Sequence, residues 1–171
     1  MQVPMKALRA LCLTAAAAAL IVGAGCGGSS TVSGSSVGPA LDQLRIHVTG
    51  SAESHSSAEC FLQLESKVTG GGRMTYCLEK FTGRPGPDAV VKSSGTATFA
   101  LPEGQIRSGV DVEQTFGPDG KHARQKLTGS VTGGTGTYEG ARGTISGGGA
   151  NVEFPPGTIT DSDLRYLIRF G

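Results

Sequence analysis

The chain has 171 residues, with 15 basic and 14 acidic side chains, a net charge of +1, 28 glycines and no tryptophan. This length suits one domain with a single hydrophobic core. The near-neutral charge argues against a nucleic-acid partner, and an aromatic content of 5% leaves little material for a sugar-stacking surface.

The first segment has the pattern of an export signal. Lys6 and Arg9 precede an apolar run at 10–22, which is the order expected of a secretory signal peptide. A membrane-spanning helix needs about 20 apolar residues, and the glycines that begin at Gly23 interrupt this run before that length. We therefore expect residues 1–25 to be a signal peptide.

Cys26 directly follows the small residues that end the apolar run. A cysteine in this position resembles the lipid-attachment site of bacterial lipoproteins, although Gly23 stands where that pattern has a branched aliphatic residue. The resemblance implies lipidation of Cys26 and anchorage to the cell membrane on its extracytoplasmic face. The alternative is cleavage after Ala24, which gives a secreted chain with a free thiol.

Residues 26–40 are expected to form a flexible tether. Their composition is almost wholly Gly, Ser, Thr and Val, which cannot bury enough apolar surface to fold. The segment 34–38 matches the G-x-S-x-G pattern of serine hydrolases. Because a nucleophile elbow needs a strand before the serine and a helix after it, we interpret this match as accidental.

The remaining residues, 41–171, predict a single all-β domain. Short runs of alternating apolar and polar residues recur, and Gly- or Pro-rich turns separate them. Leu44, Ile46 and Val48, for example, alternate with polar neighbours. The expected strands are 44–52, 58–66, 73–82, 92–101, 105–116, 122–132, 141–147 and 164–170.

The connections between these strands predict how the strands are arranged. Turn-forming residues at 70–72, 102–104 and 117–120 indicate sequential hairpins. Eight antiparallel strands without a helix to cover a sheet edge are best stabilised by closing into an up-and-down barrel. The interior of such a barrel is either filled by side chains or holds one small ligand.

Cys60 and Cys77 remain as an even pair in the expected domain. Their midpoint falls beside Thr69, close to the glycine turn, so they can face each other across a hairpin. We expect a disulfide that stabilises the fold by about 3 kcal/mol in the chain-entropy model. The alternative, a nucleophilic thiol, needs a nearby base, and only the distant His55 is available locally.

The titratable side chains predict no metal or cofactor site. His47, His55 and His122 lack metal-ligand spacing. Asp111 and Glu113 share one strand face, which we interpret as solvated. The tyrosines are expected to pack on the barrel with their hydroxyls toward water; they are Tyr76, Tyr138 and Tyr166.

The most distinctive segment, 131–143, gathers glycines around one aromatic residue. Its motif residues are Gly133, Gly134, Gly136, Tyr138, Gly140 and Gly143. Glycine is needed where the backbone bends sharply or lies close to another strand, and an aromatic ring can cover the bare backbone. We interpret the motif as architectural. A phosphate-binding loop is excluded because Glu139 replaces the third glycine and no helix is expected after it.

This segment, with the strands at 95–99 and 164–171, resembles the allene oxide cyclase and dirigent barrel superfamily. The stretch 133–136 followed by Tyr138 is common to both branches. The resemblance implies an eight-stranded antiparallel barrel. In the cyclases it also implies an acidic residue and an asparagine-held water near the early strands. The single asparagine of this chain, Asn151, is expected in a loop after the glycine run, so no cyclase residue is carried over.

The combined prediction is a lipid-anchored extracytoplasmic barrel that binds a small apolar ligand or acts as a surface interaction module. One alternative is an enzyme of the cyclase or isomerase class that acts on an unsaturated lipid-derived substrate. Another is a filled structural barrel whose outer surface meets a partner, such as a second copy of the chain. A binding barrel needs an apolar cavity, an enzyme adds a polar group facing into it, and a structural barrel needs neither.

Overall fold

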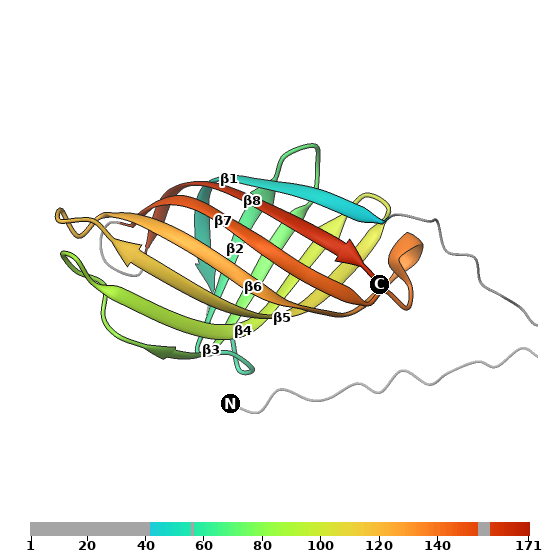
Figure 1. The fold of residues 1–171 in the computed structure, drawn as a ribbon, viewed down its shortest axis with the longest axis horizontal. Helices are drawn as coiled ribbons and strands as arrows, with labels where there is room; N and C mark the ends of the chain where they lie inside the picture. The colour runs from blue at the N-terminus through green and yellow to red at the C-terminus, as the bar shows by residue number, and fades with distance from the viewer. Residues whose placement is uncertain (1–41, 56, 154–157) are drawn as a thin grey trace, which may run out of the picture. The chain divides into compact units, whose positions relative to one another are not determined.

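A computed structural model describes residues 42–55, 57–153 and 158–171. The predicted signal peptide, the tether and Cys26 lie outside these residues. Eight antiparallel strands pair in chain order, and the last pairs with the first to close a barrel (Figure 1). The strands are β1 (Gln43–His55), β2 (Leu62–Val68), β3 (Arg73–Thr82), β4 (Val90–Leu101), β5 (Gly104–Phe116), β6 (His122–Gly134), β7 (Gly143–Glu153) and β8 (Ile159–Phe170). The predicted eight-stranded antiparallel barrel is confirmed.

The strand register places the apolar residues of each strand on one common interior. One interior row crosses the barrel through Ser93, Val112, Leu127, Gly147, Tyr166 and Ile46. Residues next to these in sequence face outward because side chains alternate along a strand. Each strand pairs with a neighbouring strand on both of its edges. The described residues therefore form a closed sheet without a free edge.

The barrel has two different ends. At the closed end, β1 begins and β8 finishes beside the 3-10 turn η1 (Gly136–Tyr138), as Figure 1 shows. The ring of Tyr138 stacks on Phe170 there, with ring centroids 6.3 Å apart. The most deeply buried apolar side chains include Phe99, Ile106 and Ile168, each with 0% exposure. At the open end, β1 finishes and β8 begins.

The strand bounds differ from the prediction mainly in β2, β7 and β8, and β8 begins at Ile159, five residues earlier than expected. β2 begins at Leu62, four residues later than expected, because the preceding segment bends, with the Glu59 N–H donating to Ser57 Oγ at 3.2 Å. β7 continues through the glycine triplet to Glu153. The expected loop at Asn151 is therefore wrong.

The glycine triplet stays in the strand because the neighbouring backbone leaves no room for side chains. A Cβ placed on Gly147, whose φ is +156°, would lie 2.1 Å from the carbonyl oxygen of Arg165 in β8. Glycine is the residue that tolerates such a close approach. Since glycine carries no apolar side chain, the alternation that marks other strands is absent here.

Cys60 and Cys77 form a disulfide, with their Cα atoms 5.4 Å apart. The predicted pairing is confirmed. Cys60 lies just before β2, and Cys77 lies within β3. The bond therefore ties the segment that leads into β2 to the neighbouring strand.

Candidate ligand cavity at the open end of the barrel

The barrel interior contains a cavity of about 270 Å³ toward its open end. Its apolar lining comes from six strands, with Leu62 and Leu64 on β2, Met74 and Leu78 on β3, Val91 on β4, Val112 on β5, Leu127 on β6 and Ile159 on β8. This volume is close to the lower limit of sites that bind small molecules. The open end is therefore incompletely filled, while the closed end is packed.

Two exposed aromatic side chains stand at the entrance to this cavity. Phe61 and Phe81 line it and contact each other, with ring centroids 4.9 Å apart. Their exposed fractions are 70% and 46%. The register of β3 shifts between Leu78 and Lys80, so Phe81 pairs with the inward-facing Ser93. This β-bulge brings Phe81 to the cavity side of a strand that would otherwise direct it outward.

A chain of hydrogen bonds crosses the interior beside the cavity. The Asn151 side-chain N–H donates to Gln125 Oε1 at 2.8 Å, and Gln125 Nε2–H donates to Tyr166 Oη at 3.0 Å. Separately, the Tyr76 hydroxyl donates to Ser93 Oγ at 3.1 Å. Gln125, Tyr76 and Ser93 all line the cavity. The apolar wall is thus interrupted by a small set of oriented polar groups.

The tyrosine hydroxyls are placed differently from the prediction. Tyr166 is 2% exposed and Tyr76 is 8% exposed, and both hydroxyls bond inside the barrel. Burial raises the pKa of both hydroxyls above the ordinary value. The prediction of water-facing hydroxyls is wrong for these two residues. The register pairs Gly147 with Tyr166, and the missing side chain leaves inner space for the ring.

The sequence reasoning missed Gln125, Ser93 and Asn151 as interior polar residues. Gln125 stands between the buried Ala123 and Leu127 at the spacing of two that marks one strand face. That spacing was the available signal for an inward-facing amide. No comparable signal existed for Asn151, because the preceding glycines conceal the strand.

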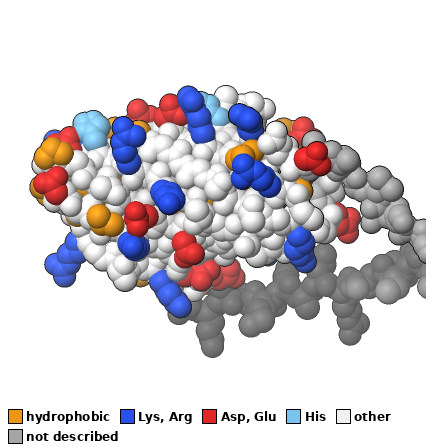
Figure 2. Space-filling model, in the orientation of Figure 1, with side chains coloured by type: hydrophobic (Ala, Val, Ile, Leu, Met, Phe, Trp, Pro, Cys, Tyr) orange, Lys and Arg blue, Asp and Glu red, His pale blue; other side chains and the backbone are white. Residues whose placement is uncertain are grey.

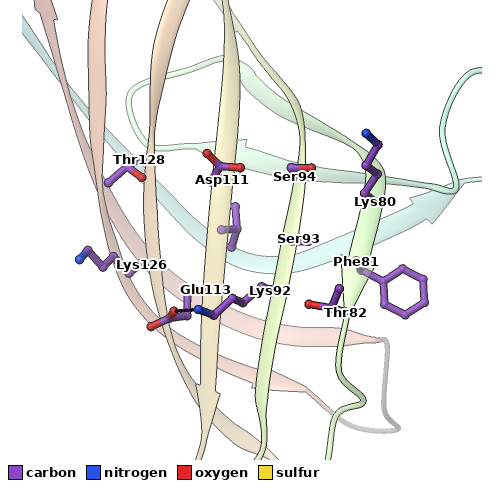
Figure 3. A pocket seen from close by; sticks show the side chains of 11 residues that line it. Lys80, Phe81, Thr82, Lys92, Ser93, Ser94, Asp111, Glu113, Lys126 and Thr128 are labelled. Atoms are coloured by element: carbon purple, nitrogen blue, oxygen red, sulfur yellow. Dashed lines mark ion pairs between the residues drawn. The ribbon is translucent and has the colours of Figure 1, made fainter.

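A second hollow, of about 410 Å³, lies on the outer wall and is lined mainly by polar side chains. Figure 3 shows two rows across it, one with Lys80, Ser94, Asp111 and Thr128, the other with Thr82, Lys92, Glu113 and Lys126. Lys92 Nζ and Glu113 Oε2 are 3.2 Å apart. Asp111 and Glu113 are exposed, which confirms that they form a solvated face. Exposed pairs of this kind contribute little binding energy.

On the face that Figure 2 shows, charges of both signs are scattered rather than gathered. The histidines take part in local surface contacts, such as His47 Nε2 with Asp163 Oδ1 at 2.9 Å and His122 with Asp119. The pKa of Asp119 is lowered, first by the backbone N–H of Lys121 and then by His122. Among the residues that the structure describes, no group of three or more His, Cys, Asp or Glu side chains can hold a metal ion.

The glycine motif lies at the closed end, away from the cavity. Gly133 and Gly134 end β6, Gly136 and Tyr138 belong to η1, Gly140 follows η1, and Gly143 begins β7. A Cβ on Gly143, whose φ is +141°, would lie 1.9 Å from the Arg169 carbonyl oxygen. The motif therefore shapes the connection that covers this end, and it contributes no side chain to the cavity.

The class of protein that the fold and the cavity define is a small antiparallel β-barrel with an apolar cavity inside one end. No family model, curated protein or solved structure matches this chain. Within the described part of the chain, no helix has the length and apolar character needed to cross a bilayer.

Proposed function

We propose that this protein binds a small, mainly apolar molecule inside the open end of its barrel. The observation that carries this proposal is the cavity of about 270 Å³, with its aliphatic wall and a few oriented polar groups. Burial of an eight-carbon chain would contribute on the order of 6 kcal/mol before ordering costs. The corresponding dissociation constants lie in the tens of micromolar or above.

We also propose that the barrel belongs to the allene oxide cyclase-like and dirigent-like superfamily. The closed eight-stranded topology supports this, as does the position of the glycine motif in the covering turn between β6 and β7. The proposal assigns no catalytic residue, and the binding role does not depend on one.

The proposed location is the extracytoplasmic face of the cell membrane, with a lipid on Cys26. Support comes from the apolar run before Cys26 and the Gly-Ser stretch after it. β1 begins at the closed end, so the preceding chain joins the barrel opposite the cavity mouth. Replacing Cys26 with Ser is expected to shift the protein from the detergent phase to the aqueous phase. Unchanged membrane association would count against the anchor.

Ligand binding is tested with the neutral fluorescent probe N-phenyl-1-naphthylamine and the chain from residue 36 onward. The probe is expected to bind the unmodified barrel with increased fluorescence. Leu64→Trp places a larger ring in the cavity and is expected to abolish binding. Gln63→Trp is the matched control, because Gln63 pairs with Cys77 in the outward-facing register.

Circular dichroism checks that both variants remain folded. Equal binding by the two tryptophan variants would place the probe outside the cavity and contradict the proposal, as would no binding by the unmodified barrel. Native mass spectrometry of protein freshly isolated from its host would then identify any molecule retained in the cavity.

A further inference from the structure

We infer that the ligand carries an uncharged hydrogen-bonding group, such as a hydroxyl or a carbonyl, which binds to Ser93, Tyr76 and Gln125 inside the cavity. This inference rests on the proposed binding function and adds the chemical class of the ligand. Three features of the cavity support it: the free hydrogen-bonding capacity of the Tyr76–Ser93 pair, the fixed orientation of Gln125, and the charge of the cavity wall.

Two hydroxyls at the cavity wall have free hydrogen-bonding capacity. Tyr76 lies on β3 and Ser93 on β4, and the Tyr76 hydroxyl donates to Ser93 Oγ at 3.1 Å. Both residues are almost fully buried, at 8% and 9% exposure. A hydroxyl can donate once and accept twice, so Ser93 keeps its own hydrogen and Tyr76 Oη keeps acceptor capacity. The pair can therefore both donate to and accept from a ligand.

The side-chain amide of Gln125 is held in a fixed orientation. Its Oε1 accepts from Asn151 at 2.8 Å and its Nε2 donates to Tyr166 at 3.0 Å. One N–H and one acceptor position remain after these bonds. Because both ends of the amide are held before a ligand arrives, little side-chain entropy is lost on binding.

The cavity wall offers no basic side chain among the described residues that line it. One of these residues, Glu153, is acidic and 5% exposed. Lys92 and Lys126 are sequence neighbours of Ser93 and Gln125, but they lie on the outer wall (Figure 3). A carboxylate ligand would be buried there without a cation, and an ammonium ligand would find the one acidic side chain already engaged within the protein. Burying a ligand charge of either sign is therefore costly. The wall therefore selects an uncharged polar group.

The inference is tested by competition against N-phenyl-1-naphthylamine with four probes of similar length: nonane, octanol, octanoate and octylamine. Octanol is expected to displace the dye at a concentration at least about 100-fold lower than octanoate at neutral pH. Octanoate or octylamine competing as well as octanol would overturn the inference. If the dye does not bind, or no probe displaces it, the proposed function itself fails.

Matched serine variants show whether the polar group of the probe meets the residues named. Ser93→Ala is expected to lower the affinity for octanol about fivefold, which is the effect of one hydrogen bond. The affinity for nonane is expected to stay unchanged. Ser94 is the outward-facing neighbour of Ser93, and Ser94→Ala is expected to change the affinity for neither probe. Tyr76→Phe is the second variant, and it is also expected to lower the affinity for octanol but not the affinity for nonane. The inference would be contradicted if Ser93→Ala and Tyr76→Phe both lowered the affinities for octanol and nonane equally.

Discussion

The two ends of this barrel are built from the same strands but have different interiors. At the closed end, Phe99, Ile106 and Ile168 are completely buried, and η1 covers this end. At the open end, the inward positions include Ser93 and Gln125, and a cavity remains. The contrast teaches that one alternating pattern can provide both a stable core and a binding site, depending on which residues occupy its inward positions.

The contrast extends to how each end is held together. The closed end relies on glycines that allow the backbones to approach, as at Gly143. The open end relies on the Cys60–Cys77 disulfide and on hydrogen bonds between side chains. Substitutions of buried residues at the closed end are therefore expected to affect mainly stability, while substitutions of cavity-lining side chains at the open end affect mainly binding.

The largest expected effect is on the glycine that begins β7. Gly143→Ala would place a Cβ 1.9 Å from the Arg169 carbonyl oxygen at a φ of +141°. Strain and overpacking together are expected to lower the free energy of unfolding by about 4 kcal/mol or more. Gly133→Ala is the control, because its Cβ would meet its nearest atom, on Arg142, at 3.7 Å. Similar losses in urea unfolding for the two variants would contradict this explanation.

A pair of core substitutions compares the two ends directly. Ile168→Ala removes a completely buried side chain at the closed end and is expected to lower the free energy of unfolding by about 3–4 kcal/mol. Leu64→Ala removes a partly buried side chain beside an existing cavity and is expected to cost less than half as much. Thermal unfolding measures both. A larger loss for Leu64→Ala would show that the open end is packed as tightly as the closed end.

Removal of the disulfide is expected to lower the free energy of unfolding slightly less than Ile168→Ala does. Replacing Cys60 and Cys77 together with Ser opens a loop closed by residues 17 positions apart. The chain-entropy model gives a loss of about 3 kcal/mol. Because Cys60 is next to Phe61 at the cavity entrance, dye binding should weaken as well. A stability loss without any change in dye affinity would separate the disulfide from the binding site.

The smallest expected effect concerns Tyr166. Tyr166→Phe leaves the Gln125 N–H without its acceptor and is expected to cost about 1–2 kcal/mol at neutral pH. Burial raises the pKa of Tyr166 above its ordinary value of 10.0. The stabilisation that comes from keeping this hydroxyl neutral is therefore complete below pH 10 and is lost as the pH rises above it. The melting temperature of the unmodified barrel should therefore fall more steeply in alkali than that of Tyr166→Phe. Parallel curves of melting temperature against pH for the two proteins would contradict this role of the Tyr166 hydroxyl.

The sequence was sufficient to predict the barrel because most strands alternate clearly. Residues such as Ile106, Val110 and Val112 occupy one face of β5, and short turns join the hairpins. The spacing of Cys60 and Cys77 around the glycine turn also predicted their bond. These features are local, so one sequence contains the information needed to recognise them.

The cavity was not predictable in the same way. The spacing of Gln125 from Ala123 and Leu127 indicates that its amide faces inward, but not whether the space beside it is filled. The β-bulge after Leu78 reverses which face Phe81 occupies. The glycines of β7 hide the strand that carries Asn151. The unfilled volume depends on all of these together, since it is set by side chains from several strands.

The central claim, that one end of the barrel receives a ligand while the other is filled, is tested most directly by methyl NMR during octanol titration. The predicted result is chemical-shift change at methyl groups of the cavity wall, in Leu64, Met74 and Leu78, with Ile106 and Ile168 unchanged. Changes at the two isoleucines equal to those at the cavity wall, or no change at any of these methyl groups, would contradict the claim.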